Sequence, residues 1–307
     1  MSFDLKNMDL KGDLRLHEPM SNHTSWKTGG NVDYYYIAAD KDDLAKFISG
    51  LPNSISITWV GLGSNLLVRD GGLSGAVVSV VGLFSELKKL NETEIYIGAG
   101  VPCAKAANFT AKNGLEGVEF LAGIPGTIGG ALAMNAGAYG GEIWSYVNEV
   151  EIINRKGKTK IYEKKEFDIS YRSVSISSDE WFISCKMKLG ISKQKIVSER
   201  IKNMLRERAT QQPLGKLSCG SVFRNPPNQY AAKLIDLCGL KGKRVGGAII
   251  SDKHSNFIIN TGNATSSDIE KLIEFVQATV YEKHSIKLVP EVRIIGKNFT
   301  EVNDAIA

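Results

Sequence analysis

Residues Gly123 to Gly141 read GIPGTIGGALAMNAGAYGG, and no other part of the chain says as much about its structure. The segment is too glycine-rich for a core helix and too apolar for a solvated linker. Ordering it costs on the order of 1–2 kcal/mol of conformational entropy per residue, which something must offset. We expect a large flat ligand to pack on its backbone. A buried bulge or a crossover between strands is the alternative.

The composition is that of an ordinary globular protein, with 307 residues, 43% hydrophobic and 23% charged. This length allows two or three domains with cores of their own. The net charge of +5 is compatible with an anionic small substrate. No dense run of Lys and Arg is interleaved with aromatic residues, which argues against a nucleic-acid partner.

The chain shows no targeting or membrane signal. Its first twenty residues carry charges of both signs and lack an apolar h-region, and no apolar run is long enough to span a bilayer. The four cysteines have no CxxC spacing and the four histidines are scattered, so we expect reduced thiols and no metal site. These observations predict a cytoplasmic protein without a membrane partner, and no obligate protein partner is evident.

The pattern of apolar residues predicts an α+β chain that changes character near Gly190. The first half reads as short strands separated by glycine turns. An amphipathic helix over residues 192–210 follows, and a smaller α+β domain completes the chain. The main elements expected are helices at 40–49, 102–114 and 230–238, a hairpin over 148–164, strands at 32–38, 55–60, 75–81, 94–97, 181–189, 246–251 and 256–260, a helix that opens at Ser267 with Glu270 in capping-box position, and a last strand at 288–295.

A second glycine-rich loop, Gly61-Leu-Gly-Ser-Asn-Leu66, follows a predicted strand. A Rossmann fingerprint needs a glycine at its sixth position and a helix directly behind it, whereas residues 67–69 predict a strand. The Rossmann interpretation therefore fails. A loop rich in peptide N–H donors, with Ser64 and Asn65, is typical of a nest that binds a phosphate group. An ordinary tight turn is the alternative.

Several motifs in order make the chain resemble the UDP-N-acetylenolpyruvoylglucosamine reductase family from about Thr24 to Gly296. They are Thr28-Gly-Gly30, GLGSNLL from Gly61, the Gly123–Gly141 stretch, Ser170-Tyr-Arg-Ser173, SCGSVFRNP from Ser218 to Pro226, and PEVRIIG from Pro290 to Gly296. No long tyrosine-bearing insertion lies between Ser173 and Trp181. The chain is therefore similar to the shorter subgroup of this family.

The resemblance implies a FAD-binding domain of the vanillyl-alcohol-oxidase type over residues 24–190, with two subdomains that divide near 70–75. A smaller α+β substrate-binding domain covers residues 191–300, and its last strand, 288–295, returns toward the flavin. FAD is expected to be non-covalent because neither glycine loop contains a histidine. The residues implied to bind it are Gly61, Leu62, Gly63, Ser64, Asn65, Leu66, Gly123, Ile124, Pro125, Gly126, Thr127, Gly129 and Gly130.

Three catalytic residues follow from the resemblance. Ser221 matches the proton donor, Arg172 matches the residue that stabilises the substrate carboxylate as charge develops, and Glu291 matches the third catalytic group. The chemistry agrees, because an enolate-like species needs a cation and hydrogen-bond donors placed beforehand. Each residue also has a structural alternative: a cap or turn serine, a surface strand arginine, and a strand salt bridge of Glu291 with Arg293.

Substrate-binding positions implied by the motifs are Tyr139, Tyr171, Asn225 and Arg293. The chain departs from the family at Gln211, where the family often has a lysine that would pair with the diphosphate of UDP or the substrate anion. Lys216, Arg224 or Lys233 would have to replace it.

The implied function is the NADPH-dependent reduction, through FAD, of UDP-N-acetylglucosamine enolpyruvate to UDP-N-acetylmuramate. This reaction belongs to the synthesis of peptidoglycan precursors, and hence to cell-wall biogenesis, cell shape and cell division. The expected partner is a UDP-sugar. Two alternatives remain open: another FAD-dependent oxidoreductase of the same fold, such as an oxidase, or an inactive nucleotide-binding module.

Overall fold

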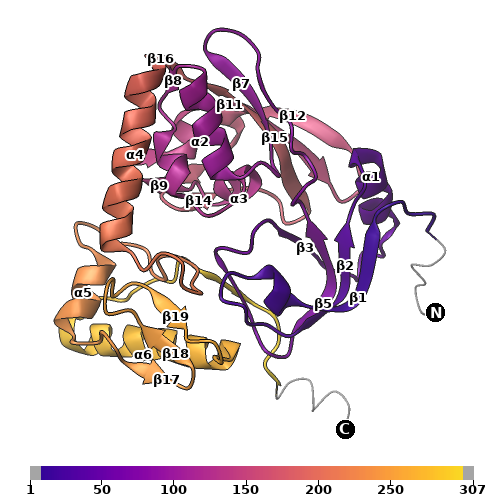
Figure 1. Cartoon of the computed structure of the whole chain (residues 1–307). Helices are drawn as coiled ribbons and strands as arrows, with labels where there is room; N and C mark the ends of the chain where they lie inside the picture. Colours follow the sequence, from indigo (N-terminus) through magenta and orange to yellow (C-terminus); the bar gives the residue numbers. More distant parts are fainter. Residues whose placement is uncertain (1–7, 300–307) are drawn as a thin grey trace. The chain divides into compact units, whose positions relative to one another are not determined.

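The computed structural model describes residues 8–299 (Figure 1). The chain divides into two compact units that are interleaved along the sequence. Unit 1 comprises Met1–Leu16, Tyr34–Gly61 and Gly75–Glu207, and unit 2 comprises His17–Asp33, Leu62–Ser74 and Arg208–Ala307. The glycine loop at residues 61–66 therefore passes from unit 1 into unit 2. The expected boundary between a FAD-binding and a substrate-binding domain near residue 190 stays a prediction.

A four-stranded sheet packed on one helix lies mainly in unit 1. Its order is β1-β2-β5-β3, with β1 Asp13–Pro19, β2 Asn31–Ile37, β5 Leu73–Ser79 and β3 Ile57–Val60. Helix α1, Lys41–Gly50, buries Leu44, Phe47 and Ile48, which recur at the spacing of one helical face. Asp40 caps the helix by accepting a hydrogen bond from the Asp43 N–H. The predicted strand–helix–strand order is confirmed here.

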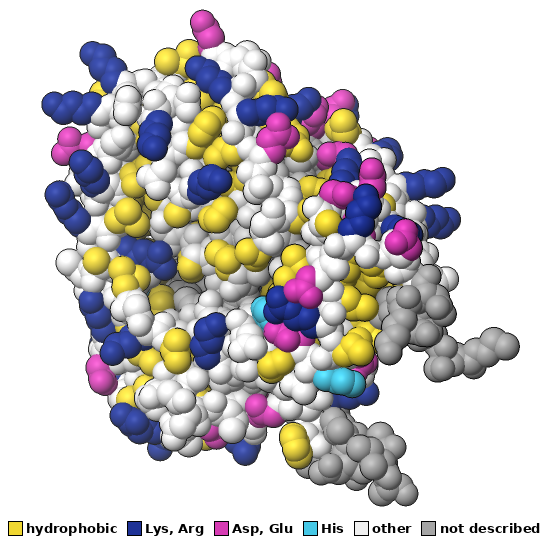
Figure 2. All heavy atoms as spheres, turned by 45° about the vertical axis from the view of Figure 1, so that its right-hand side comes forward, with side chains coloured by type: hydrophobic (Ala, Val, Ile, Leu, Met, Phe, Trp, Pro, Cys, Tyr) yellow, Lys and Arg dark blue, Asp and Glu magenta, His cyan; other side chains and the backbone are white. Residues whose placement is uncertain are grey.

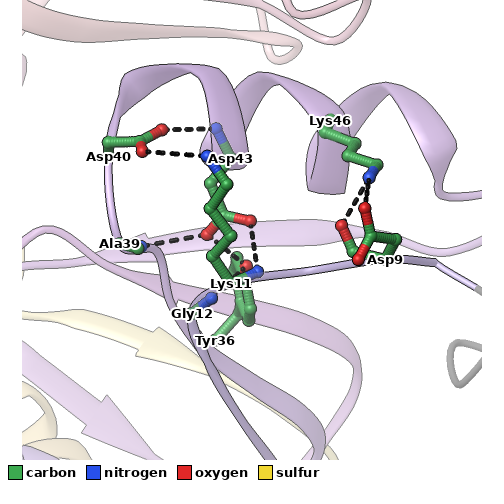
Figure 3. A network of polar contacts seen from close by, with 8 residues as sticks. All are labelled: Asp9, Lys11, Gly12, Tyr36, Ala39, Asp40, Asp43 and Lys46. Atoms are coloured by element: carbon green, nitrogen blue, oxygen red, sulfur yellow. Dashed lines mark hydrogen bonds and ion pairs between the residues drawn. The ribbon is translucent and has the colours of Figure 1, made fainter.

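A buried carboxylate ties the N-terminal segment to this sheet and helix (Figure 3). Asp43, only 4% exposed, accepts hydrogen bonds from the Lys11 N–H, the Ala39 N–H and the Tyr36 hydroxyl, at 2.8, 2.9 and 2.5 Å. Burial alone would raise the pKa of Asp43, but these bonds outweigh it and hold the pKa below its usual value. The carboxylate therefore joins three separate backbone segments of unit 1.

The second part of unit 1 is a five-stranded sheet covered by helices (Figure 1). Its order is β12-β11-β15-β7-β6, with β12 Thr159–Glu163, β11 Val147–Asn154, β15 Glu180–Lys188, β7 Glu94–Gly98 and β6 Leu87–Lys89. The antiparallel pairing of β11 with β12 confirms the predicted hairpin. Helices α2, Cys103–Lys112, and α3, Ile128–Ala133, pack in the same apolar core as β7, β11 and β15.

Helix α3 corrects one expectation. The Gly123–Gly141 stretch does contain a buried helical segment, because Thr127 accepts a hydrogen bond from the Gly130 N–H and caps it. Ile128, Ala131 and Leu132 then fall on one face and are buried. Beyond α3, short pairs complete unit 1: β9 Gly137–Ala138 with β10 Gly141–Glu142, β13 Ile169–Ser170 with β14 Ser173–Val174, and β8 Leu115–Glu116 with β16 Gly190–Ile191.

Unit 2 is built on a three-stranded sheet and helix α6 (Figure 1). The elements are β17 Arg244–Val245, β18 Ala248–Ile250, β19 Ile258–Asn260, α5 Ala231–Leu237, α6 Ser266–His284 and the parallel pair β4 Leu66–Val68 with β20 Arg293–Ile295. Helix α4, Gln194–Gln211, runs from unit 1 into unit 2. Trp26 and Leu67, from early in the sequence, complete the core of unit 2.

Two expectations for unit 2 are wrong in detail. Thr265, not Ser267, caps α6, and Asp268 completes the capping box. Glu270 forms an ion pair with Arg69 instead, with 2.7 Å between Arg69 Nη2 and Glu270 Oε1. The last strand covers only Arg293–Ile295, since the residues before it pair with a different segment through an isolated bridge between Phe223 and Pro290.

The surface carries mixed charge. Figure 2 shows Lys and Arg side chains spread over the visible face, with Asp and Glu side chains among them. Within residues 8–299, no helix combines the length and apolarity that crossing a membrane requires.

Candidate active site

The loop at residues 61–66 is shaped by a close approach of the chain. Gly63 adopts a left-handed backbone angle, φ 61°, and a Cβ there would overlap the carbonyl oxygen of His23. The Gly63 carbonyl accepts a hydrogen bond from the Ser25 N–H at 3.1 Å. Only glycine is therefore compatible with this turn.

The two glycine loops singled out in the sequence meet within unit 1. A Cβ on Gly61 would lie 2.5 Å from Thr127 Oγ1, so the start of one loop lies directly on the cap residue of α3. The N–H groups of Ile128 and Gly129 donate to the carbonyls of Val101 and Ala99, both at 2.9 Å. These two N–H groups of the second loop are therefore already paired with backbone carbonyls.

Arg172 lies in the two-residue turn that joins β13 to β14, also in unit 1. Its backbone is left-handed, φ 56°, instead of the extended conformation of a surface strand. The Nη2 group donates to the Gly137 carbonyl at 2.6 Å and Nη1 to the Asn135 carbonyl at 3.4 Å. The guanidinium also lies over the Tyr171 ring, 4.9 Å from its centroid. These contacts fix the direction of a charged group that is only partly exposed.

Ser221 and Glu291 lie close together in unit 2. The Glu291 N–H donates to the Val222 carbonyl at 2.7 Å, so Glu291 pairs with the residue next to Ser221. Asn256 holds the same segment, because its carbonyl accepts from the Val222 N–H at 2.8 Å. Glu291 therefore belongs to an irregular segment before β20 and not to a strand face shared with Arg293.

The first glycine loop reaches this pair within unit 2. Asn65 Nδ2 donates to the Glu291 carbonyl at 3.0 Å, and the Asn65 carbonyl accepts from the Arg293 N–H at 3.0 Å. The sulfur of Cys219 lies 3.7 Å from the Gly63 carbonyl oxygen and 3.6 Å from that of Leu66. Burial raises the pKa of Cys219 to about 12, so the thiol stays protonated. Predicted cofactor-binding and catalytic positions are thus directly bonded.

Comparison with known proteins gives this arrangement a family. Residues 32–162 match the FAD binding domain, and residues 212–295 match the C-terminal domain of UDP-N-acetylenolpyruvoylglucosamine reductase. The UDP-N-acetylenolpyruvoylglucosamine reductase of Legionella pneumophila is 50% identical over 287 residues, 93% of each chain. That of Nitrosococcus oceani is 46% identical over 94% of this chain and 97% of its own.

The chain belongs to the UDP-N-acetylenolpyruvoylglucosamine reductase family.

A crystal structure of the UDP-N-acetylenolpyruvylglucosamine reductase from Thermus caldophilus has the same fold. It is 30% identical to this chain, with a TM-score of 0.79 over 93% of this chain and 99% of that one. The predicted family, α+β fold class and FAD-containing oxidoreductase are therefore confirmed. The individual site residues stay predictions.

The glycine loops of this UDP-N-acetylenolpyruvoylglucosamine reductase family member fit an extended ligand such as FAD. Gly130 is exposed, and a Cβ there would meet only Thr127 Oγ1, at 3.7 Å. A ligand can therefore lie directly against its backbone, where any other residue would place a side chain. Ser64 and Asn65 add polar groups beside the other loop.

The predicted substrate positions divide between the units. In unit 1, Tyr171 and Tyr139 are 46% and 44% exposed, and the Tyr139 hydroxyl donates to the Met204 carbonyl at 2.8 Å. In unit 2, Arg293 is exposed, and Asn225 Oδ1 accepts from the Ala231 N–H, the first of α5, at 3.1 Å. Asn225 thus has a structural role in addition to any contact with substrate.

The candidates to replace the family lysine at Gln211 include one unusual group. The Nε atom of Arg224 is buried and has no hydrogen-bond partner among the described residues, although the side chain is partly exposed. Buried polar atoms are nearly always bonded in native proteins. Arg224 is therefore the candidate whose surroundings leave room for a further polar contact.

Sequence reasoning did not single out two buried asparagines. Asn135 lies beneath the Arg172 turn, and Asn256 brackets Phe223, donating to its carbonyl and accepting from its N–H, both at 2.9 Å. They are 0% and 3% exposed. Asn135 lies inside the Gly123–Gly141 stretch, so the sequence already indicates that its region matters. The sequence does not indicate its hydrogen-bond partners, which are 7 to 35 residues away.

Proposed function

We propose that this chain reduces UDP-N-acetylglucosamine enolpyruvate to UDP-N-acetylmuramate with electrons from NADPH, and so supplies a peptidoglycan precursor. The observation that carries the proposal beyond family membership is the direct bonding of Asn65, in the predicted cofactor loop, to Glu291, beside Ser221. A proton donor has to lie next to the cofactor for this reaction, and the bonds from the predicted cofactor loop to the Glu291 segment support that placement.

We propose that residues 61–66 and 123–130 hold FAD. When bound and reduced by NADPH, FAD supplies a hydride to C3 of the enolpyruvyl group. The chain's own residues must then manage the negative charge that develops on C2 and the adjoining carboxylate. A rigid arrangement of donors does so with little reorganisation.

In this proposal Arg172 binds the substrate carboxylate, because a planar guanidinium matches its two oxygens. Its plane is already fixed by the Gly137 and Asn135 carbonyls. Ser221 gives its hydroxyl proton to C2. The Ser221 side chain is partly exposed, so its hydroxyl is accessible to a substrate. Glu291 polarises Ser221 or helps restore its proton.

The cellular setting is proposed on the same ground. An enzyme that makes this sugar nucleotide contributes to cell-wall synthesis, and hence to cell shape and division, and the cytoplasm is its expected compartment. Its partner is the UDP-sugar, and no protein partner is required for the chemistry.

The experiment is to mix the purified, FAD-loaded protein with NADPH and the enolpyruvyl sugar nucleotide. The expected product has gained two hydrogens by mass spectrometry. In Ser221→Ala, flavin reduction by NADPH should stay within about twofold, whereas reoxidation by the substrate should slow about a hundredfold or more. Ser267→Ala, an exposed serine of the same unit, is the control.

Equal slowing of both half-reactions would remove Ser221 from the proton-donor role. Rapid reoxidation by oxygen without any effect of the enolpyruvyl substrate would favour an oxidase. A protein that retains no FAD would support the inactive nucleotide-binding module.

A further inference from the structure

We propose that Asn135 is the positioning residue for Arg172 and thereby determines how well the substrate carboxylate is held. The inference rests on the proposed function for the identity of the substrate, but the placement of Arg172 can be measured without it. Nothing in the sequence motifs assigned a role to Asn135.

Asn135 occupies a place that few residues could fill. It is fully buried and its backbone is left-handed, φ 45°. Asn and Asp tolerate this region better than other non-glycine residues, because their short polar side chains bond locally. A buried amide is costly unless its donors and acceptor are paired, and here they are.

The side chain of Asn135 joins three segments. Its Nδ2 group donates to Glu142 Oε2 at 2.8 Å and to the Ser170 carbonyl at 3.1 Å. Its Oδ1 atom accepts from the Trp144 N–H at 3.4 Å. Ser170 directly precedes the Tyr171–Arg172 turn, so the amide fixes the base of the hairpin that carries the guanidinium.

The backbone of Asn135 contacts the other end of Arg172, its guanidinium. Its carbonyl accepts from Arg172 Nη1 at 3.4 Å, and the Gly137 carbonyl, two residues on, accepts from Nη2 at 2.6 Å. Asn135 therefore contacts Arg172 at both ends. Its side chain holds the turn that carries the Arg172 backbone, and its carbonyl binds the guanidinium. A carboxylate is bound bidentately only if that plane is correct.

The test compares Asn135→Ala with Asn113→Ala, an exposed asparagine of unit 1 whose side chain makes one bond, to the Phe109 carbonyl. In Asn135→Ala, reoxidation of the reduced flavin by the enolpyruvyl substrate should slow about 10- to 100-fold, the effect of misplacing a positioning group. FAD content and flavin reduction by NADPH should stay within about twofold. Asn113→Ala should leave all three unchanged.

A double-mutant cycle separates positioning from general destabilisation. In an Arg172→Lys background, adding Asn135→Ala should cost less than about threefold, because the group that it positions is gone. The full loss in that background, or equal loss in both half-reactions, would overturn the inference.

A second set of variants covers the case in which Asn135→Ala does not fold. Asn135→Asp keeps the size and backbone preference, and its carboxylate, when ionised, cannot donate to Glu142 or Ser170. Pairing it with Glu142→Gln restores one bond with the donor reversed, and should recover part of the lost rate. If Asn135→Asp retains the wild-type rate at a pH high enough to ionise it, or if the pair recovers none of the loss, the inference fails.

A crystal structure of the Asn135 variant gives a readout independent of turnover. Arg172 Nη2 should leave the Gly137 carbonyl. If the guanidinium stays in place, the inference is wrong. Should the unmodified protein fail to use the enolpyruvyl substrate, the proposed function fails, while this distance still decides the role of Asn135.

Discussion

The two groups of predicted catalytic residues are held by different means. In unit 1 the charged end of Arg172 is fixed by two carbonyls at the end of a long side chain, on a turn with a left-handed backbone. In unit 2 Ser221 and Glu291 are placed by backbone bonds through Val222, and their side chains are shorter. A guanidinium is therefore sensitive to small changes in its surroundings, whereas the hydroxyl depends on the integrity of a bonded segment.

Gly137→Ala should have the largest effect on substrate reduction, because it changes the contacts that fix the Arg172 guanidinium. A Cβ at this position would overlap the Gly141 carbonyl oxygen and lie 3.2 Å from Arg172 Nη1. The β9–β10 pair must then shift and carry the guanidinium contact with it. Substrate reduction should slow about 100-fold, the cost of roughly 1 Å of misplacement. Stopped-flow measurement of both half-reactions checks this, and flavin reduction by NADPH should stay near normal.

Ala138→Gly, in the same β9 strand, is the comparison for Gly137→Ala. It relaxes the strand without adding an atom, so it should slow the substrate step far less. Equal effects of the two substitutions would mean that the Arg172 contact does not matter.

Asn256→Ala tests the arrangement in unit 2 and should act mainly on stability. It removes two hydrogen bonds to Phe223 and leaves a buried N–H and carbonyl unpaired. The free energy of unfolding should fall by about 2 kcal/mol. Chemical denaturation measures this free energy. The rate of substrate reduction should fall only as far as Ser221 is displaced. A loss of activity with unchanged stability would show that the segment is positioned by Asn256 without being stabilised by it.

Asp43→Asn is expected to have the smallest effect, about 1 kcal/mol of stability at neutral pH, because the amide keeps one acceptor for several donors. The pKa of Asp43 is lowered in the folded protein, so its contribution is complete above the unfolded value of about 4. That contribution is lost as the pH falls from there through the lower folded value. The stability of the unmodified protein should thus decline more steeply below about pH 4 than that of the variant.

Denaturation curves across that acidic range measure the difference. The substrate half-reaction should be unaffected at neutral pH, since Asp43 touches neither candidate group. A matching loss of activity would mean that the Arg172 arrangement responds to the stability of unit 1 as a whole.

The sequence predicted elements whose signals are local. Helix α1 and the β11–β12 hairpin follow from the spacing of buried residues and from glycine at the turn. Helix α3 was missed because a Thr cap and three apolar positions outweigh its two glycines. The length of the last strand was wrong because pairing of Pro290 with Phe223 is decided by a partner 67 residues away.

The candidate site shows the same division. Resemblance supplied Arg172, Ser221 and Glu291, but the left-handed turn at Arg172 and the buried amides of Asn135 and Asn256 arise from contacts between distant segments. Asparagine is also common in surface loops, so the residue type alone does not reveal that these two side chains are buried. Only the folded chain shows which polar groups hold the reactive ones.

The interleaving of the two units has a consequence for biosynthesis. Trp26, buried in unit 2, donates through Nε1 to the Ile258 carbonyl at 2.8 Å, across 232 residues. As the ribosome releases the chain from its N-terminus, Trp26 and Leu67 emerge long before the helix and strands that will enclose them. Both apolar side chains therefore stay without their final neighbours through most of translation, which prolongs the exposure of apolar surface on the nascent chain.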